Sequence, residues 1–265
     1  MRLKNKVAVV TASTRGIGRA IVTKFAEEGA IVYMAARNKE RAQVAIDEYK
    51  KLGQTVKFVY NDATKIDTFK SMIDEVVEAE GRIDILVNNF GTSDPSLDKN
   101  IETTSPEDFS RFIDINLKSV FISSQAAISY MKKQQSGSII NISSVGGTVP
   151  DISQIAYGTS KAAINHMTRM IAIQEGRNNI RCNAVCPGIT ATDAVKNNLS
   201  DDFQNLFMKH IPIKRMGTPE EIANAVCYFA SDEAAYTTGQ ILEVSGGFGI
   251  ATPVFGDLAD FMTSR

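Results

Sequence analysis

A tyrosine and a lysine four residues apart, Tyr157 and Lys161, are the residues of this chain best suited to proton transfer. They lie in a run, residues 155–161, that reads as helix, so both side chains are expected on one helical face about one turn apart. A nearby ammonium favours the phenolate, so the phenol is expected to lose its proton more easily. Such a pair suits ketone reduction or alcohol oxidation. Most pairs with this spacing are ordinary solvated helix faces, so the motif gains meaning only from its neighbours.

A glycine-rich turn near the N-terminus suggests a phosphate site. It reads Thr11-Ala-Ser-Thr-Arg-Gly16-Ile-Gly18, and it joins a strand-like run to a helix. Glycines let the backbone approach a pyrophosphate closely, and the helix N-terminus presents free N–H groups to it. Glycine also serves in any tight turn from strand to helix, but a position in the first such unit favours phosphate binding.

The end of the second predicted strand discriminates between nicotinamide cofactors. A site for NAD carries an acidic residue about twenty residues after the glycines, where it holds the ribose hydroxyl. Here the strand ends in Met34-Ala-Ala-Arg37-Asn38, without a carboxylate, and Arg15 of the glycine turn is within reach of the same place. Two guanidinium groups suit a 2′-phosphate, so the sequence predicts NADP. The alternative is that Arg37 only covers a solvent-exposed strand end.

The elements that position these residues alternate between strand and helix. Strand-like runs occupy residues 7–10, 31–34, 56–60, 83–87, 138–142, 180–185 and 241–244, and helical patterns occupy 17–28, 39–52, 68–80, 106–133, 155–176 and 219–231. Several strands are nearly continuous apolar runs, as expected when helices cover both faces of a sheet. The alternation predicts an α/β fold with right-handed crossovers and one doubly wound parallel sheet.

One domain is expected over residues 1–265, because no long linker or repeat divides the chain. Two regions break the alternation of strand and helix, a helical excursion at about 191–213 and a tail at 248–265. Ligands of open α/β sheets lie beyond the carboxyl ends of the strands, so we expect the excursion to be a substrate lid.

Composition excludes several classes of function. The chain has 265 residues, of which 43% are hydrophobic and 22% charged, with a net charge of −1. Neither nucleic acid nor a membrane is therefore an expected partner, and no apolar run is long enough to cross a bilayer. Three cysteines, Cys182, Cys186 and Cys227, lack the spacing of a metal site. We expect reduced thiols in the core, no metal, and a cytoplasmic location.

Together these motifs resemble the short-chain dehydrogenase/reductase family over nearly the whole chain. The matching positions are Thr11, Gly16, Gly18, Asp62, the run Asn88-Asn-Phe-Gly91, Asn116, Ser143-Ser144, Tyr157, Lys161, Pro187-Gly188 and Thr192. The resemblance implies a Rossmann-type fold. Two positions depart from the family pattern: Ala12 replaces a glycine and Phe90 replaces an alanine. We expect Ala12 to adopt a negative φ, which alanine tolerates.

Site roles follow from the resemblance, position by position. It implies that Tyr157 is the proton donor or acceptor, that Lys161 assists it, that Ser144 rather than Ser143 orients the substrate oxygen, and that Asn116 holds a water of the proton relay. It places Asn88 along the cofactor as well. The implied cofactor contacts are Ser13, Thr14, Arg15, Gly16, Ile17, Gly18, Arg37, Asn38, Asp62, Ala63, Asn89, Gly91, Tyr157, Lys161, Ile189 and Thr192.

The substrate is indicated mainly by the loops around this site. Residues 88–100, 149–157 and 246–253 are similar to those of clostridial hydroxysteroid dehydrogenases that act on the 7-alpha hydroxyl of bile acids. That resemblance implies a steroid substrate and, from the family, a homotetramer. An apolar cleft for a rigid ring system is expected from Phe90, Val145, Val149, Ile189, Ile211 and Phe248. Dimerisation is expected through apolar positions of two long helices, Phe121, Ile128, Ile164 and Ile171.

Two other functions stay open. The first is reduction of a ketoacyl group on an acyl carrier protein, which needs a basic surface facing an acidic partner. The only basic cluster that stands out is Lys132-Lys133. The second is a cofactor-sensing protein without turnover. Such proteins usually lack the tyrosine or the lysine, and both are present here.

Overall fold

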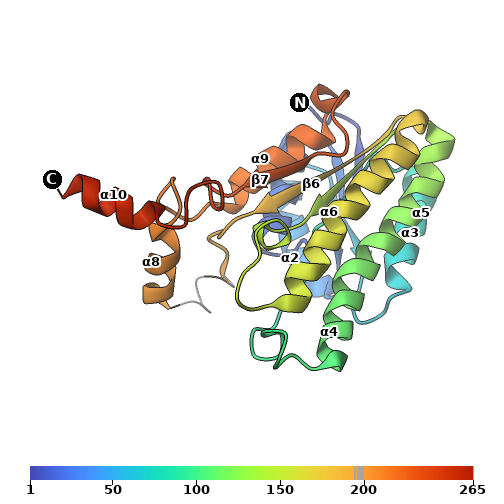
Figure 1. The fold of residues 1–265 in the computed structure, drawn as a ribbon. Helices are drawn as coiled ribbons and strands as arrows, with labels where there is room; N and C mark the ends of the chain where they lie inside the picture. Colours follow the sequence, from blue (N-terminus) through green and yellow to red (C-terminus); the bar gives the residue numbers. More distant parts are fainter. Residues whose placement is uncertain (194, 196–199, 265) are drawn as a thin grey trace.

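The computed structural model, which describes residues 1–193, 195 and 200–264, is built on one sheet of seven parallel strands (Figure 1). The strands are β1 (Val7–Thr11), β2 (Ile31–Ala36), β3 (Val56–Tyr60), β4 (Ile85–Asn88), β5 (Gly137–Ile142), β6 (Ile180–Pro187) and β7 (Ile241–Val244). Their order in space is β3-β2-β1-β4-β5-β6-β7. The chain leaves β1 in one direction for β2 and β3 and then returns to the other side for β4. This reversal places a ligand cleft at the carboxyl ends of β1 and β4.

Helices cover both faces of the sheet, as predicted. One apolar core joins α1 (Gly16–Glu27), α2 (Lys39–Lys51) and α9 (Pro219–Ala230) to the sheet. A second core joins α3 (Thr68–Glu80), α5 (Ser119–Gln134) and α6 (Ile155–Glu175) to the opposite face. Central strands such as β1 and β5 are buried throughout, whereas the edge strand β3 includes exposed residues. The apolar runs of the sequence therefore mark strands covered on both faces, and the prediction of a doubly wound sheet is confirmed.

One predicted helix is interrupted. The sequence predicted continuous helix over residues 106–133, but α4 (Pro106–Ile113) and α5 are joined by a π-helical turn, Asp114–Lys118. A π-helical turn inserts an extra residue into the helical repeat, and such turns are frequent at functional sites. This one contains Asn116, which is fully buried.

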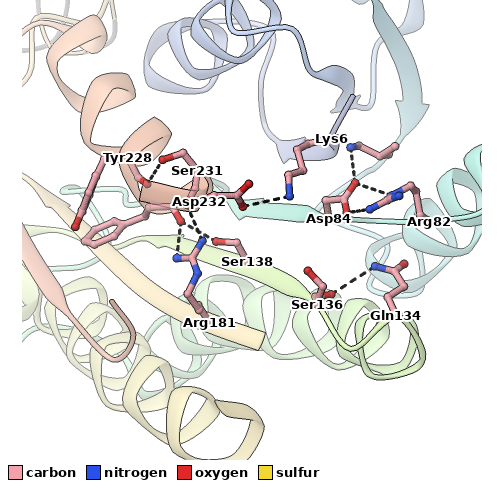
Figure 2. A network of polar contacts seen from close by, with 12 residues as sticks. Lys6, Arg82, Asp84, Gln134, Ser136, Ser138, Arg181, Tyr228, Ser231 and Asp232 are labelled. Carbon is pink, nitrogen blue, oxygen red and sulfur yellow. Dashed lines mark hydrogen bonds and ion pairs between the residues drawn. The ribbon is translucent and has the colours of Figure 1, made fainter. Parts of the chain in front are cut away.

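Polar contacts hold the amino ends of the strands together (Figure 2). The Asp84 carboxylate accepts the Val7 N–H at 2.8 Å and also pairs with Arg82. Arg181 donates to the main-chain oxygens of Phe229 at 2.7 Å and of Ser231 at 3.1 Å, at the carboxyl end of α9. A cation is favourable there because the helix dipole is negative at that end. This edge of the sheet is thus fixed by its own polar groups.

Beyond the sheet, α8 (Asp201–Lys209) and α10 (Phe255–Thr263) project from the body and contact each other (Figure 1). The Lys209 ammonium lies 2.7 Å from the Asp257 carboxylate, and the rings of Phe207 and Phe248 stack at 5.1 Å between centroids. The predicted lid and tail are therefore helical and packed together. Residues 194 and 196–199 of the predicted lid lie outside the described part of the chain. No helix in the described part is both long and apolar enough to cross a membrane.

Candidate active site

The tyrosine and the lysine of the sequence motif lie together in the first turns of α6. The Lys161 Nζ atom is 5.5 Å from the centroid of the Tyr157 ring, so the two side chains share one helical face, as the spacing predicted. Lys161 is only 3% exposed, and its ammonium donates to the main-chain oxygen of Ile142 at 2.9 Å. The pair is therefore set against the carboxyl end of β5.

Burial, rather than mutual attraction, dominates the electrostatics of this pair. Removal from water lowers the pKa of Lys161 to about 8, because the charged ammonium loses hydration. Burial also raises the pKa of Tyr157, and the hydrogen bond with Ser144 opposes that rise only in part. The expectation that the neighbouring ammonium makes the phenol a stronger acid is wrong for this state of the protein.

The structure distinguishes the two neighbouring serines. Ser144 shares a hydrogen bond with the Tyr157 side chain, and its Oγ also accepts the Gly146 N–H at 3.1 Å. Ser143 is buried, and its hydroxyl donates to the main-chain oxygen of Lys161 at 3.1 Å. Ser144 therefore faces the Tyr157 side chain, whereas Ser143 braces the backbone of α6.

Asn116 holds the loop after β4 against α6. Its side-chain oxygen accepts the Thr92 N–H at 2.8 Å, and its amide nitrogen donates to the Thr92 oxygen at 2.9 Å. The same nitrogen is 3.2 Å from the Ser160 hydroxyl, on the helix that carries Tyr157. The π-helical turn thus brings Asn116 into the polar group around the tyrosine and lysine.

A cavity of about 560 Å³ opens at the carboxyl ends of β1, β2 and β4. Most of the predicted cofactor residues line it: Thr14, Arg15, Gly16, Ile17, Gly18, Arg37, Asp62, Ala63, Asn89, Gly91 and Thr192. Lys161 lies at one end, because a Cβ atom added at Gly91 would be 2.9 Å from its Nζ. The cavity therefore runs from the two arginines towards Lys161.

The glycine turn is shaped to receive an anionic group. The first turn of α1 contains no acidic residue, and the side chain of Arg15, the residue before the helix, forms no capping hydrogen bond. A Cβ atom at Gly18 would lie 2.6 Å from both the Ala12 oxygen and the Asn89 Nδ2, so only glycine allows this close packing. Free N–H groups at a helix N-terminus fit a pyrophosphate, and the residues present are thus compatible with a dinucleotide.

Ala12 departs from our expectation. Its φ is +50°, in the left-handed region, whereas the sequence predicted a negative value. The conformation is held from outside the turn, because the Asn89 side chain donates to the main-chain oxygens of Thr11 at 3.0 Å and Ala12 at 3.2 Å. Alanine pays about 1–2 kcal/mol for this conformation, which glycine adopts freely.

Several predicted contacts lie away from the cavity wall. Ser13 is fully buried, and the exposed Asn38 caps α2 by accepting the Arg41 N–H at 2.6 Å. The Ile189 oxygen accepts the Gly217 N–H. Asn88 is buried between Ser123, Ser124 and Asn141, so it stabilises the sheet instead of facing a ligand. The cavity lining also omits Tyr157 and Lys161, which stand beyond its end.

The predicted apolar cleft is only partly assembled. Phe90 lines the cavity beside the glycine turn and packs edge-on against Phe69, with centroids 6.1 Å apart. Ile211 is only 2% exposed and lies under Gly246. Ile211 is therefore not available to a ring substrate, whereas Phe90 faces the cavity. Val149 contacts the tail at Gly249, and Phe248 is stacked on the lid helix.

Sequence reasoning missed other residues of the site. Ala35, Ala36, Asn61, Thr64, Thr92 and Ile115 line the cavity. Ala35 and Ala36 end β2, and Asn61, Thr64 and Thr92 follow strand ends, which was the one available signal because the carboxyl ends of parallel strands meet at one edge. Ile115 lies in the π-helical turn and had no such signal. A further missed residue is the buried Asp98, which contacts the first turn of α6. The cysteines are free and buried, as expected of core residues.

Comparison with known proteins gives consistent matches. A family model described as enoyl-(acyl carrier protein) reductase matches residues 11–249. The chain is 52% identical to a 7alpha-hydroxysteroid dehydrogenase of Clostridium sardiniense, over 97% of this chain and 98% of the relative. It is 48% identical to a 7alpha-hydroxysteroid dehydrogenase of Paraclostridium sordellii, over 100% and 98% of the two chains.

Two further matches are less similar in sequence: a relative with a different named activity and a solved structure. The chain is 38% identical to the 3-oxoacyl-[acyl-carrier-protein] reductase FabG of Thermotoga maritima, over 93% of this chain and 99% of the relative. A 7 alpha-hydroxysteroid dehydrogenase complexed with NADH and 7-oxo glycochenodeoxycholic acid superposes with a TM-score of 0.88. It is 35% identical and covers 93% of this chain and 95% of its own.

Proposed function

The chain belongs to the short-chain dehydrogenase/reductase family, and on that premise we propose that it is an NADP-dependent 7-alpha-hydroxysteroid dehydrogenase. It would reversibly oxidise the 7-alpha hydroxyl of bile acids to the 7-ketone, in the cytoplasm and with its thiols reduced. The substrate comes from the two clostridial relatives, and the chemistry is supported by the site.

The observation that carries the proposal is the buried lysine beside the tyrosine. An ordinary lysine, with a pKa of 10.5, stays protonated at neutral pH, whereas burial brings the pKa of Lys161 to about 8. A group with a pKa near the working pH can both take and give a proton. Lys161 therefore suits a relay that returns protons to the tyrosine from solvent.

The roles of the chain's residues follow from their contacts. Tyr157 removes the hydroxyl proton in oxidation and supplies it in reduction. Ser144, hydrogen-bonded to the same phenol, orients the substrate oxygen. Asn116, fixed on Thr92, supports the relay that leads away from Lys161. NADP, when bound, accepts or supplies the hydride.

Two arginines support NADP over NAD. Arg15 and Arg37 both line the cavity, and β2 ends at Ala36, so Arg37 stands where a carboxylate would follow the strand in an NAD site. Guanidinium groups favour a 2′-phosphate, which carries charge that NAD lacks. We expect Arg37→Ala to weaken NADP binding by about 10-fold or more, consistent with losing a charged hydrogen bond, and to change NAD binding little. Equal losses for both cofactors would contradict this assignment.

The test of the substrate is direct. Purified protein is mixed with a 7-alpha-hydroxy bile acid and NADP, and NADPH formation is followed by absorbance. NAD in place of NADP and the 7-beta epimer are the controls. We expect turnover only with the alpha epimer and a preference for NADP. A preference for the beta epimer, or no turnover of either, would refute the proposed reaction.

A second candidate is 3-ketoacyl-carrier-protein reductase, which the Thermotoga relative favours. Docking of an acidic carrier needs a basic surface beside the catalytic pair. Lys132 and Lys133 lie in the last turn of α5, near the start of β5, and Lys132 pairs with Glu175 at 3.0 Å. These lysines lie at the amino ends of the strands, whereas Tyr157 and Lys161 lie at the carboxyl ends. A carrier bound at the lysines would not reach the tyrosine, which favours the steroid reaction. Reduction of an acetoacetyl thioester with NADPH, faster than that of a 7-keto bile acid, would reverse the choice.

We also propose a homotetramer assembled through α5 and α6. Phe121 on α5 is 50% exposed, and Met170 and Ile173 on α6 are exposed as well. Ile164 and Ile171, which the sequence suggested for this role, are buried in the core of the subunit. Exposed apolar side chains on two adjacent helices fit a self-complementary interface. Sedimentation of a monomer at micromolar concentration would contradict it.

A further inference from the structure

The catalytic helix begins without a cap of its own. Gln154, the residue before α6, has a left-handed backbone (φ 60°) and forms no side-chain hydrogen bond to the helix. The first N–H groups of any helix lack partners within it and must find them elsewhere. Here the missing partners come from a loop more than fifty residues earlier in the chain.

Asp98, in the loop that follows β4, supplies two of these partners. Its Oδ1 accepts the Ala156 N–H and its Oδ2 accepts the Tyr157 N–H, both at 2.9 Å. The next residue, Lys99, accepts the Ile155 N–H on its main-chain oxygen at 3.1 Å. Asp98 is fully buried, so its carboxylate depends on these hydrogen bonds and on the positive end of the helix dipole.

The loop that holds Asp98 is itself fixed at both ends. Thr92, six residues before, exchanges two hydrogen bonds with Asn116. On the other side of Asp98, the Lys99 N–H donates to the Thr104 hydroxyl at 2.8 Å. One loop therefore connects the π-helical turn of Asn116 to the first turn of the helix that carries Tyr157.

The first turn of α6 needs this support. Tyr157 is followed by Gly158, a poor helix former that costs about 1 kcal/mol relative to alanine. Glycine is favoured at this position because a Cβ atom there would lie 3.1 Å from the Gly146 oxygen, beside Ser144. The close approach that brings Ser144 to Tyr157 thus weakens the turn, and Asp98 compensates from outside.

We propose that Asp98 is a positioning residue: it fixes the first turn of α6 and so holds the Tyr157 phenol in line with Ser144. The inference rests on the proposed role of Tyr157. Displacement of a reacting group by about 1 Å costs on the order of 100-fold in rate. Asp98→Ala should therefore lower kcat by on the order of 10- to 100-fold. KM and NADP binding should change by less than about 3-fold, because Asp98 is absent from the cavity lining.

A matched control is available at the opposite edge of the sheet. Asp84 is another buried carboxylate that accepts a main-chain N–H, that of Val7 (Figure 2). Asp84→Asn should lower stability without lowering kcat at a temperature where both variants remain folded. Asp98→Asn, whose amide oxygen still accepts one N–H, should retain more activity than Asp98→Ala. Wild-type kcat in Asp98→Ala, or an equal fall of kcat in Asp84→Asn, would overturn the inference.

A second readout is independent of turnover. Amide hydrogen exchange on the protein without substrate should show lost protection at Ala156 and Tyr157 in Asp98→Ala and retained protection in Asp84→Asn. Unchanged exchange at these two amides overturns the inference even if the wild-type chain proves inactive on every hydroxysteroid. That inactivity would refute only the proposed function.

Discussion

Replacing Lys161 by methionine should stabilise the protein at neutral pH while destroying its activity. Lys161 is 3% exposed, and burial lowers its pKa from 10.5 to about 8. Each unit of pKa shift corresponds to about 1.4 kcal/mol, so the buried charge costs about 3 kcal/mol wherever both folded and unfolded states are protonated. Methionine has a similar length and no charge, so it avoids this cost.

The pH dependence is the sharper part of this prediction. Below about pH 8 the folded protein carries the full cost of the charged lysine. Between about pH 8 and 10.5 the unfolded state binds more protons than the folded one, so wild-type stability from this group rises with pH. Of the cost of the buried charge, about 3 kcal/mol, about 2 kcal/mol should disappear between about pH 7 and pH 9.5, and the stability difference between the variant and the wild type should fall by the same amount.

Urea unfolding of the cofactor-free protein across this pH range measures the gap, with protein concentration held constant. The variant also loses the hydrogen bond from Lys161 to the Ile142 oxygen, which lowers its free energy of unfolding by about 1 kcal/mol at every pH. This loss does not change how the stability difference varies with pH. Lys51→Met, at an exposed lysine of α2, is the control. Its free energy of unfolding should differ from that of the wild type by an amount that does not vary with pH. A gap between Lys161→Met and the wild type that does not vary with pH would refute the reasoning.

Three further predictions concern the tyrosine and the glycine turn. Tyr157→Phe should lower kcat by about 100- to 10,000-fold, the usual contribution of general acid–base catalysis. NADP affinity, measured by fluorescence titration, should stay within about 2-fold, because only the hydroxyl is lost; near-normal kcat would remove the assignment. Ala12→Gly should stabilise the protein by about 0.5–1 kcal/mol, because it relieves a φ of +50°; an unchanged urea midpoint would contradict this. Gly18→Ala should weaken NADP binding by about 10-fold or more, because its Cβ would meet the Ala12 oxygen at 2.6 Å. Gly176→Ala is its control, since nothing lies within 4 Å of the added methyl group, and similar losses in both would exclude a local clash.

The order of elements was predictable because local pattern and tertiary burial coincide in this fold. β1 and β2 lie inside the sheet with both faces covered, so nearly every residue in them is buried and the strands read as apolar runs. The spacing of Tyr157 and Lys161 was equally informative, because the geometry of one helix fixes their relation. The glycine turn was recognisable for the same reason, since its function depends on consecutive backbone groups.

What the sequence by itself determined is therefore the α/β architecture, the placing of Tyr157 and Lys161 on one helical face and the glycine turn between β1 and α1. Only the tertiary structure decided the conformation of Ala12, the different contacts of Ser144 and Ser143, and the support of α6 by Asp98. Each of these depends on partners distant in the chain: Asn89 for Ala12, the helix backbone at Lys161 for Ser143, and α6 for Asp98. The direction of the Tyr157 pKa shift was decided in the same way, because burial in the assembled fold raises the pKa more than the hydrogen bond with Ser144 lowers it.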